Sequence, residues 1–174
     1  MRTGTDEAER PKYAHVERER RWLVDAARWP VHNAVGHVLI EDLYIDGTVL
    51  RLRRMTDSAS GNITRKLTKK YPTSDVRARP IVTAYLTDAE YAVFATLPAR
   101  PLRKRRHVLP ESAGGYSVDV FLGPLAGLVL AERECADDRT LAALAAPPWA
   151  LREVTDDPAY AGGMLATTGR PEID

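Results

Sequence analysis

Hydrophobic and polar residues alternate with a period of two in several short segments of this chain, a pattern typical of strands with two unlike faces. We expect strands at residues 16–24, 38–44, 48–55, 63–71, 81–86, 102–108, 116–121 and 128–134. Turn signals at Asp46 and Gly47, and at Gly114 and Gly115, favour antiparallel hairpins over crossover connections. The pattern therefore predicts a mainly antiparallel sheet.

Helical periodicity is confined to three short segments. Thr87 and Glu90 form a capping box ahead of apolar residues that share one helical face, so we expect this helix to pack on the sheet. Those apolar residues are Tyr91, Phe94 and Leu97. An alanine-rich helix is expected at 137–145, and a last helix is expected to open at Asp157 and to reach Leu165.

The length of 174 residues fits one domain. Residues 1–14 are charged and poor in apolar side chains, so we expect a flexible tail there, a single domain at 15–168 and a short tail at 169–174. No apolar run approaches the ~20 residues that span a bilayer, and the polar, acidic start does not resemble a secretory signal. With one cysteine, Cys135, the sequence favours a reducing, cytoplasmic location.

The arrangement of charge is more informative than its total. The 25 Lys and Arg residues nearly balance the 24 Asp and Glu residues, and a net charge of +1 predicts no bulk attraction to nucleic acid or membrane. Within the strands, however, like charges repeat at alternate positions and so share one face. These pairs are Glu17 and Glu19, Arg51 and Arg53, Lys104 and Arg106, and Glu132 and Glu134.

Two interpretations of these ionic faces are open. They are either the ordinary solvated side of an antiparallel sheet, or the inner side of a curled sheet. In the second case each isolated charge would cost several kcal/mol to bury, so acids and bases must offset one another or bind ligands of both signs. Carboxylates without His or Cys favour hard cations such as Mg²⁺ or Mn²⁺, and many cations together suit a triphosphate.

The same residues, in this order, resemble the CYTH superfamily, also called triphosphate tunnel metalloenzymes. The family's opening motif, Glu-any-Glu-any-Lys, reads here as Glu17, Glu19 and Arg21. Further matches are the stretches VLRLRR, RKLTKKY, LRKRR, SVDVFLG and LVLAERE. The resemblance extends from about residue 15 to 165 and implies an α+β fold, namely a closed eight-stranded antiparallel β-barrel, or tunnel, with a few flanking helices.

The resemblance also implies a site within the tunnel. Its metal ligands would be Glu17, Glu19, Asp119, Glu132 and Glu134, holding Mg²⁺ or Mn²⁺. Its phosphate-binding residues would be Arg21, Arg51, Arg53, Lys66, Lys70, Lys104 and Arg106. The catalytic residues would be Tyr44, at the position of the proton acceptor proposed for the small bacterial members, and Arg21. Because an arginine stays protonated, Arg21, which replaces the family's lysine, is expected to clamp phosphate rather than to act as a base.

The function that this resemblance implies is metal-dependent hydrolysis of a triphosphate, with inorganic tripolyphosphate as the first candidate substrate and release of the terminal phosphate. A class IV adenylate cyclase, or a triphosphatase acting on thiamine triphosphate or a nucleotide, is the alternative among enzymes. A non-catalytic polyphosphate-binding or nucleic-acid-binding module is the alternative from another class. Near-zero net charge disfavours nucleic acid. We expect no membrane partner and either a monomer or a homodimer.

Overall fold

The computed structural model describes residues 11–31, 34 and 36–172. Over these residues the chain forms nine strands: β1 (His15–Val24), β2 (Val38–Ile45), β3 (Leu50–Asp57), β4 (Ile63–Lys70), β5 (Ala78–Tyr85), β6 (Ala99–Val108), β7 (Ser117–Phe121), β8 (Val129–Glu134) and β9 (Ala150–Glu153). The same part of the chain contains three α-helices: α1 (Asp88–Phe94), α2 (Asp138–Ala143) and α3 (Gly162–Thr168). The expected tails lie partly outside these residues, and the division into tails and one domain stays a prediction.

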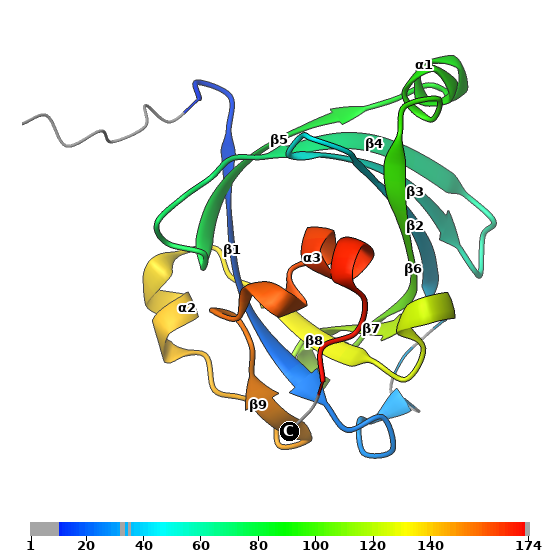
Figure 1. Ribbon diagram of the computed structural model, residues 1–174. Helices are drawn as coiled ribbons and strands as arrows, with labels where there is room; N and C mark the ends of the chain where they lie inside the picture. The colour runs from blue at the N-terminus through cyan, green and yellow to red at the C-terminus, as the bar shows by residue number, and fades with distance from the viewer. Residues whose placement is uncertain (1–10, 32–33, 35, 173–174) are drawn as a thin grey trace, which may run out of the picture.

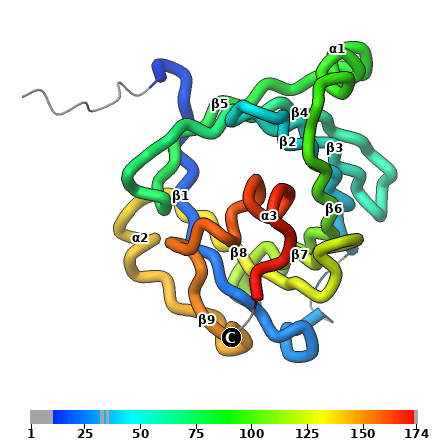
Figure 2. Tube along the Cα trace, in the orientation of Figure 1, coloured from blue at the N-terminus to red at the C-terminus, as the bar shows by residue number. Residues whose placement is uncertain are grey.

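The strands form one antiparallel sheet that closes on itself (Figure 1). Their order is β5-β4-β3-β2-β6-β7-β8-β1, and β5 then pairs with the first half of β1, where Arg79 lies opposite Glu17. The tube in Figure 2 follows the same ring. β9 pairs outside the barrel with the second half of β1, where Glu153 lies opposite Trp22. The expected fold class, a closed eight-stranded antiparallel barrel with flanking helices, is confirmed.

Local sequence explains most of the element boundaries. The capping box of α1 forms as expected, because the Thr87 side chain accepts from the backbone N–H of Glu90 and the Glu90 side chain accepts from that of Thr87. α1 packs on the sheet at β4, where the Arg65 guanidinium lies 5.8 Å from the centre of the Tyr91 ring, although none of the helix residues is fully buried. The expected helix 157–165 is divided, because Ala161 has an extended backbone between a 3₁₀ turn (Pro158–Tyr160) and α3.

Two apolar clusters stabilise the barrel. One lies on the outward face of β1, β7 and β8, where Trp22 meets the Tyr116 ring edge to face and Tyr116 meets Trp149 in the same way. The other joins residues of the inward face to the C-terminal segment around Tyr160 and Leu165. Burying each such side chain contributes roughly 1.5–3 kcal/mol. The second cluster fills part of the barrel interior, and Figure 1 shows α3 within the ring of strands.

Across the part of the chain that the structure describes, no helix has the length and apolar character needed to cross a membrane.

Candidate functional site

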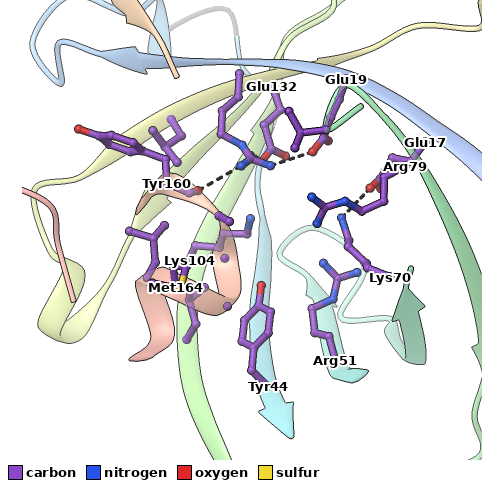
Figure 3. Close-up of a pocket in the computed structure, with 18 of the residues that line it drawn as sticks. Glu17, Glu19, Tyr44, Arg51, Lys70, Arg79, Lys104, Glu132, Tyr160 and Met164 are labelled. Atoms are coloured by element: carbon purple, nitrogen blue, oxygen red, sulfur yellow. Dashed lines mark hydrogen bonds and ion pairs between the residues drawn. The ribbon is translucent and has the colours of Figure 1, made fainter. Parts of the chain in front are cut away.

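A cavity of about 440 Å³ occupies the barrel interior. Because alternate residues of a strand point to the same side, the ionic faces of the strands all line this cavity. The C-terminal segment contributes another part of the wall through Tyr160 and Met164 (Figure 3). The segregated charges therefore face one another inside the barrel, and the interpretation as an ordinary solvated face is wrong for them.

Most of the expected site residues line this cavity. They are Glu17, Glu19, Arg21, Tyr44, Arg51, Arg53, Lys70, Lys104, Arg106, Glu132 and Glu134. Asp119 lies behind the lining, with 0% of its surface exposed. Lys66 is not part of the lining, and its ammonium instead lies 4.9 Å from the centre of the Tyr85 ring. Of the two lysines that share a face of β4, the structure thus brings Lys70 to the site.

Arg21 bridges two carboxylates, Glu19 on its own strand β1 and Glu132 on the neighbouring strand β8. Its Nη2 donates to Glu19 Oε1 at 2.8 Å and its Nε donates to Glu132 Oε1 at 2.9 Å. Its Nη1 also donates to the backbone carbonyl of Tyr160 at 3.1 Å, which ties the C-terminal segment to β1. Burial alone would lower the pKa of Arg21, but Glu132 and Glu19 raise it above its ordinary value. Arg21 therefore stays charged and is unsuited to act as a base.

Asp119 organises the cations of β6. Its Oδ2 accepts from Lys104 Nζ at 2.5 Å, and its two oxygens accept from Arg106 Nε at 2.7 Å and Nη2 at 2.6 Å. Arg106 Nη2 also donates to Glu132 Oε2 at 2.5 Å. Burial lowers the pKa of Lys104, although Asp119 opposes the shift. Asp119 thus holds two cations in place and presents no free oxygen to the cavity.

Asp42 forms a second buried pair, whose role the sequence did not reveal. Its carboxylate is 2% exposed and accepts from Arg53 Nε at 2.6 Å and Nη2 at 2.7 Å, a two-pronged contact across the β2–β3 pair. Burial would raise the pKa of Asp42, but Arg53 and Arg51 more than offset this and lower it. The Arg53 guanidinium is therefore fixed against the wall before any ligand enters.

Tyr44 lies in the cavity wall beside these charges. Burial and the Asp42 carboxylate raise the pKa of its phenol, while Arg51 and Arg53 act in the opposite direction. The phenol is therefore protonated at neutral pH. Glycine at 162 is what lets α3 approach, because a Cβ there would lie 2.0 Å from the Tyr44 hydroxyl.

The carboxylates that line the cavity are oxygen ligands of the kind that divalent cations such as Mg²⁺ prefer. Among the described residues, no three His, Cys, Asp or Glu side chains converge as a ready metal group. Mg²⁺ nevertheless needs only one or two carboxylates when substrate phosphates complete its shell. Glu19 and Glu132 offer two on one wall, and the pKa of Glu19 is raised by burial and by Glu132. A cation between them would relieve this repulsion, so the donor set fits Mg²⁺ or Mn²⁺.

The two other expected metal ligands are placed differently. Glu17 accepts from Lys70 Nζ at 2.6 Å across the cavity wall. Glu134 lies at the end of β8, 60% exposed, with its Oε1 3.4 Å from His15 Nε2. The five expected ligands therefore do not form one cluster.

Arg79 is the cavity residue that sequence reasoning missed most clearly. It enters the lining from β5, opposite Glu17 of β1. A signal existed, because Arg77 and Arg79 repeat the alternating basic pattern of the other strands. Proline is rare in the interior of a strand, yet β5 begins at Ala78 and includes Pro80.

Comparisons with solved structures support the fold. The inorganic triphosphatase NE1496 is 23% identical, with a TM-score of 0.54 and coverage of 86% of this chain and 93% of that one. A second structure of NE1496, described as a hypothetical protein, is 25% identical, with a TM-score of 0.55 and coverage of 86% and 97%. The PH1819 protein from Pyrococcus horikoshii OT3 is 16% identical, with a TM-score of 0.54 and coverage of 72% and 82%.

No protein-family model and no curated protein sequence matches the chain. The neighbours share the antiparallel barrel, and the likeness is consistent with a triphosphate tunnel of the CYTH type.

Proposed function

We propose that this chain is a triphosphatase that hydrolyses the terminal phosphoryl group of a triphosphate, with inorganic tripolyphosphate as its first candidate substrate. One observation carries the proposal: within the described residues, five strands direct seven cationic side chains into one cavity. They are Arg21, Arg51, Arg53, Lys70, Arg79, Lys104 and Arg106. The structural likeness to an inorganic triphosphatase supports the same activity.

The cations would bind and orient the phosphate chain. Guanidinium forks and ammonium groups donate charge-assisted hydrogen bonds to phosphate oxygens, and each is strongest where water is excluded. Arg53 and Lys104 are already held by buried carboxylates, so little ordering is left to do when a ligand arrives. In phosphoryl transfer, such positioning and charge neutralisation supply most of the catalysis.

The reaction itself is a simple exchange of bonds. A water oxygen bonds to the terminal phosphorus, the bond from that phosphorus to the bridging oxygen breaks, and phosphate and pyrophosphate are released. Tyr44 would orient the water, and its deprotonated form would take up the proton of the water. Glu19 and Glu132 would hold Mg²⁺ or Mn²⁺, which when bound supplies further neutralisation of the phosphate oxygens.

Phosphate release tests the proposal. We expect turnover of tripolyphosphate with Mg²⁺ or Mn²⁺, and EDTA should abolish it. Phosphate release from ATP, thiamine triphosphate and pyrophosphate is measured under the same conditions. Lys70→Gln should reduce kcat/KM by roughly 10–100-fold, the cost of a charge-assisted contact. Lys69→Gln is the matched control, because Lys69 is exposed and lies against the Tyr71 ring outside the cavity. Absence of turnover with every substrate, or equal loss in both variants, would refute the proposal.

A further inference from the structure

Two guanidinium groups in the cavity differ from the other cations, because no carboxylate of the described residues contacts them as closely. Arg21, Arg53, Lys70, Lys104 and Arg106 each contact a carboxylate oxygen at 2.9 Å or less. Arg51 lies farther from its carboxylate neighbour, with its Nε 4.0 Å from Asp42 Oδ1. For Arg79, the part of the chain that the structure describes provides neither an ion pair nor a side-chain hydrogen bond.

The same two side chains have buried N–H groups without a partner. The Nε atoms of Arg51 and Arg79 are inaccessible to solvent and make no hydrogen bond to any described residue. A buried donor left without an acceptor costs free energy, and a charged group costs more than a neutral one. Both guanidinium groups also line the cavity, where an anionic ligand would supply acceptors to their other N–H groups.

The carboxylates next to Arg51 and Arg79 accept hydrogen bonds from other cations. Glu17 lies directly opposite Arg79 across the β1–β5 pair, but its carboxylate accepts from Lys70 at 2.6 Å. Asp42 is likewise engaged by Arg53 through both oxygens. Figure 3 shows Arg51, Lys70 and Arg79 together on the side of the cavity opposite Tyr160 and Met164. The excess positive charge of the cavity is therefore concentrated on that side.

We infer that Arg51 and Arg79 form an anion subsite that receives the free end of a phosphate chain. The inference rests on the proposed function and adds to it a residue, Arg79, and a chemical preference. A terminal phosphoryl group carries up to two negative charges and three oxygens, so it can accept from two guanidinium forks at once. An internal phosphoryl group carries one charge and two non-bridging oxygens, which suits two forks less well.

Binding in the presence of EDTA tests this subsite apart from catalysis. Titration calorimetry compares tripolyphosphate with trimetaphosphate, which has three phosphoryl groups in a ring and no free end. We expect the intact protein to bind tripolyphosphate more tightly, and Arg79→Gln to weaken that binding at least tenfold while changing trimetaphosphate binding less than threefold. Arg79→Lys keeps the positive charge but not the guanidinium fork, so its affinity for tripolyphosphate should lie between those of the intact protein and Arg79→Gln.

Arg77→Gln is the control for lost charge. Arg77 lies two residues earlier, is 46% exposed and pairs with Asp156 at 2.5 Å, and it does not line the cavity. We expect the affinity of Arg77→Gln for tripolyphosphate to stay within twofold of that of the intact protein. Three results would each overturn the subsite. The first is an affinity of Arg79→Gln for tripolyphosphate within twofold of that of the intact protein, and the second is an equal loss of affinity for the linear and cyclic ligands. The third is no binding of tripolyphosphate by the intact protein.

Thermal unfolding separates a binding role from a structural one. Because Arg79 has no ion pair with any residue that the structure describes, Arg79→Gln should have a Tm equal to or above that of the intact protein, and a smaller Tm increase with tripolyphosphate. A large fall in the ligand-free Tm would indicate a structural role and contradict the inference. If affinity depends on Arg79 but no phosphate is released with Mg²⁺ or Mn²⁺, the proposed hydrolysis fails and the subsite stands. If phosphate is released but the affinity for tripolyphosphate does not depend on Arg79, the proposed hydrolysis stands and the subsite fails.

Discussion

Tyr44 and Gly162 touch across the barrel interior, so closely that a Cβ at position 162 would lie 2.0 Å from the tyrosine hydroxyl oxygen. The contact joins β2 to the first residue of α3. Tyr44 is partly buried in the cavity wall and packs against the apolar cluster that contains Tyr160 and Leu165. The glycine therefore sets how deeply α3 enters the barrel.

Gly162→Ala should displace α3 or Tyr44. We expect a loss of about 1–3 kcal/mol in the free energy of unfolding, the usual cost of an added methyl group in a packed interior. Gly163→Ala is the matched control, because a Cβ there would meet Tyr44 at an ordinary 3.6 Å, and alanine favours the helix. Urea unfolding of both variants measures the difference, and equal stability would contradict this account of the contact.

Asp42→Asn should destabilise the protein strongly at neutral pH. The substitution leaves the buried Arg53 guanidinium without its carboxylate, which typically costs about 3–5 kcal/mol. Because burial is outweighed by Arg53 and Arg51, the folded pKa of Asp42 lies below its unfolded value near ~3.9. Its contribution is therefore complete above that value and is lost as pH falls through the folded pKa.

The difference in stability between the intact protein and Asp42→Asn should consequently narrow as the pH falls below the ordinary carboxyl pKa of about 4. Asp46→Asn is the comparison, since Asp46 is 44% exposed and lies 3.3 Å from Arg100, a pair worth less than about 1 kcal/mol. Thermal unfolding across this range checks the sign. A gap that widens in acid would be inconsistent with a lowered pKa.

Tyr44→Phe should reduce kcat by roughly a hundredfold or more, the usual contribution of a positioned base. Burial and Asp42 raise the pKa of the phenol, so it is mainly protonated at neutral pH. Below that pKa, the deprotonated fraction grows tenfold with each pH unit. kcat/KM of the intact protein should accordingly rise with pH into the alkaline range. The variant should lose this rising limb while KM changes little. A rising limb of unchanged slope in Tyr44→Phe would assign the proton to another group.

Glu19→Gln should weaken metal activation by at least ~10-fold, because even residues that only orient a metal ligand contribute that much. Burial and Glu132 raise the pKa of Glu19, so its ionisation opposes folding above its unfolded pKa. The metal-free variant should therefore be no less stable than the intact protein at pH 7. Activity against Mn²⁺ concentration, with thermal unfolding in EDTA, tests both parts. Unchanged activation would remove Glu19 from the metal site.

The sequence predicted the barrel wall well because strand faces alternate, and it predicted which charges share a side. It could not predict position along the barrel axis. Lys66 and Lys70 share a face, yet Lys70 alone of the two lines the cavity. Alternation likewise cannot distinguish a residue that lines a cavity from one that lies behind it, as Asp119 does.

Contacts between segments distant in the chain explain the other differences. β9 has only four residues and pairs with β1, so no local alternation reveals it. Arg79 comes to the cavity through the β1–β5 pairing, which closes the barrel. Substrate, metal preference and cytoplasmic location stay predictions.

The ion pairs inside the barrel make ligand entry an exchange of partners. Glu132 occupies both Arg21 and Arg106, so a phosphate oxygen that takes either guanidinium releases a carboxylate oxygen. Affinity for an anion alone then reflects the difference between two acceptors rather than the sum of new contacts. A divalent cation that takes the released oxygens would remove this penalty, so anion and cation should each tighten the binding of the other by the same factor.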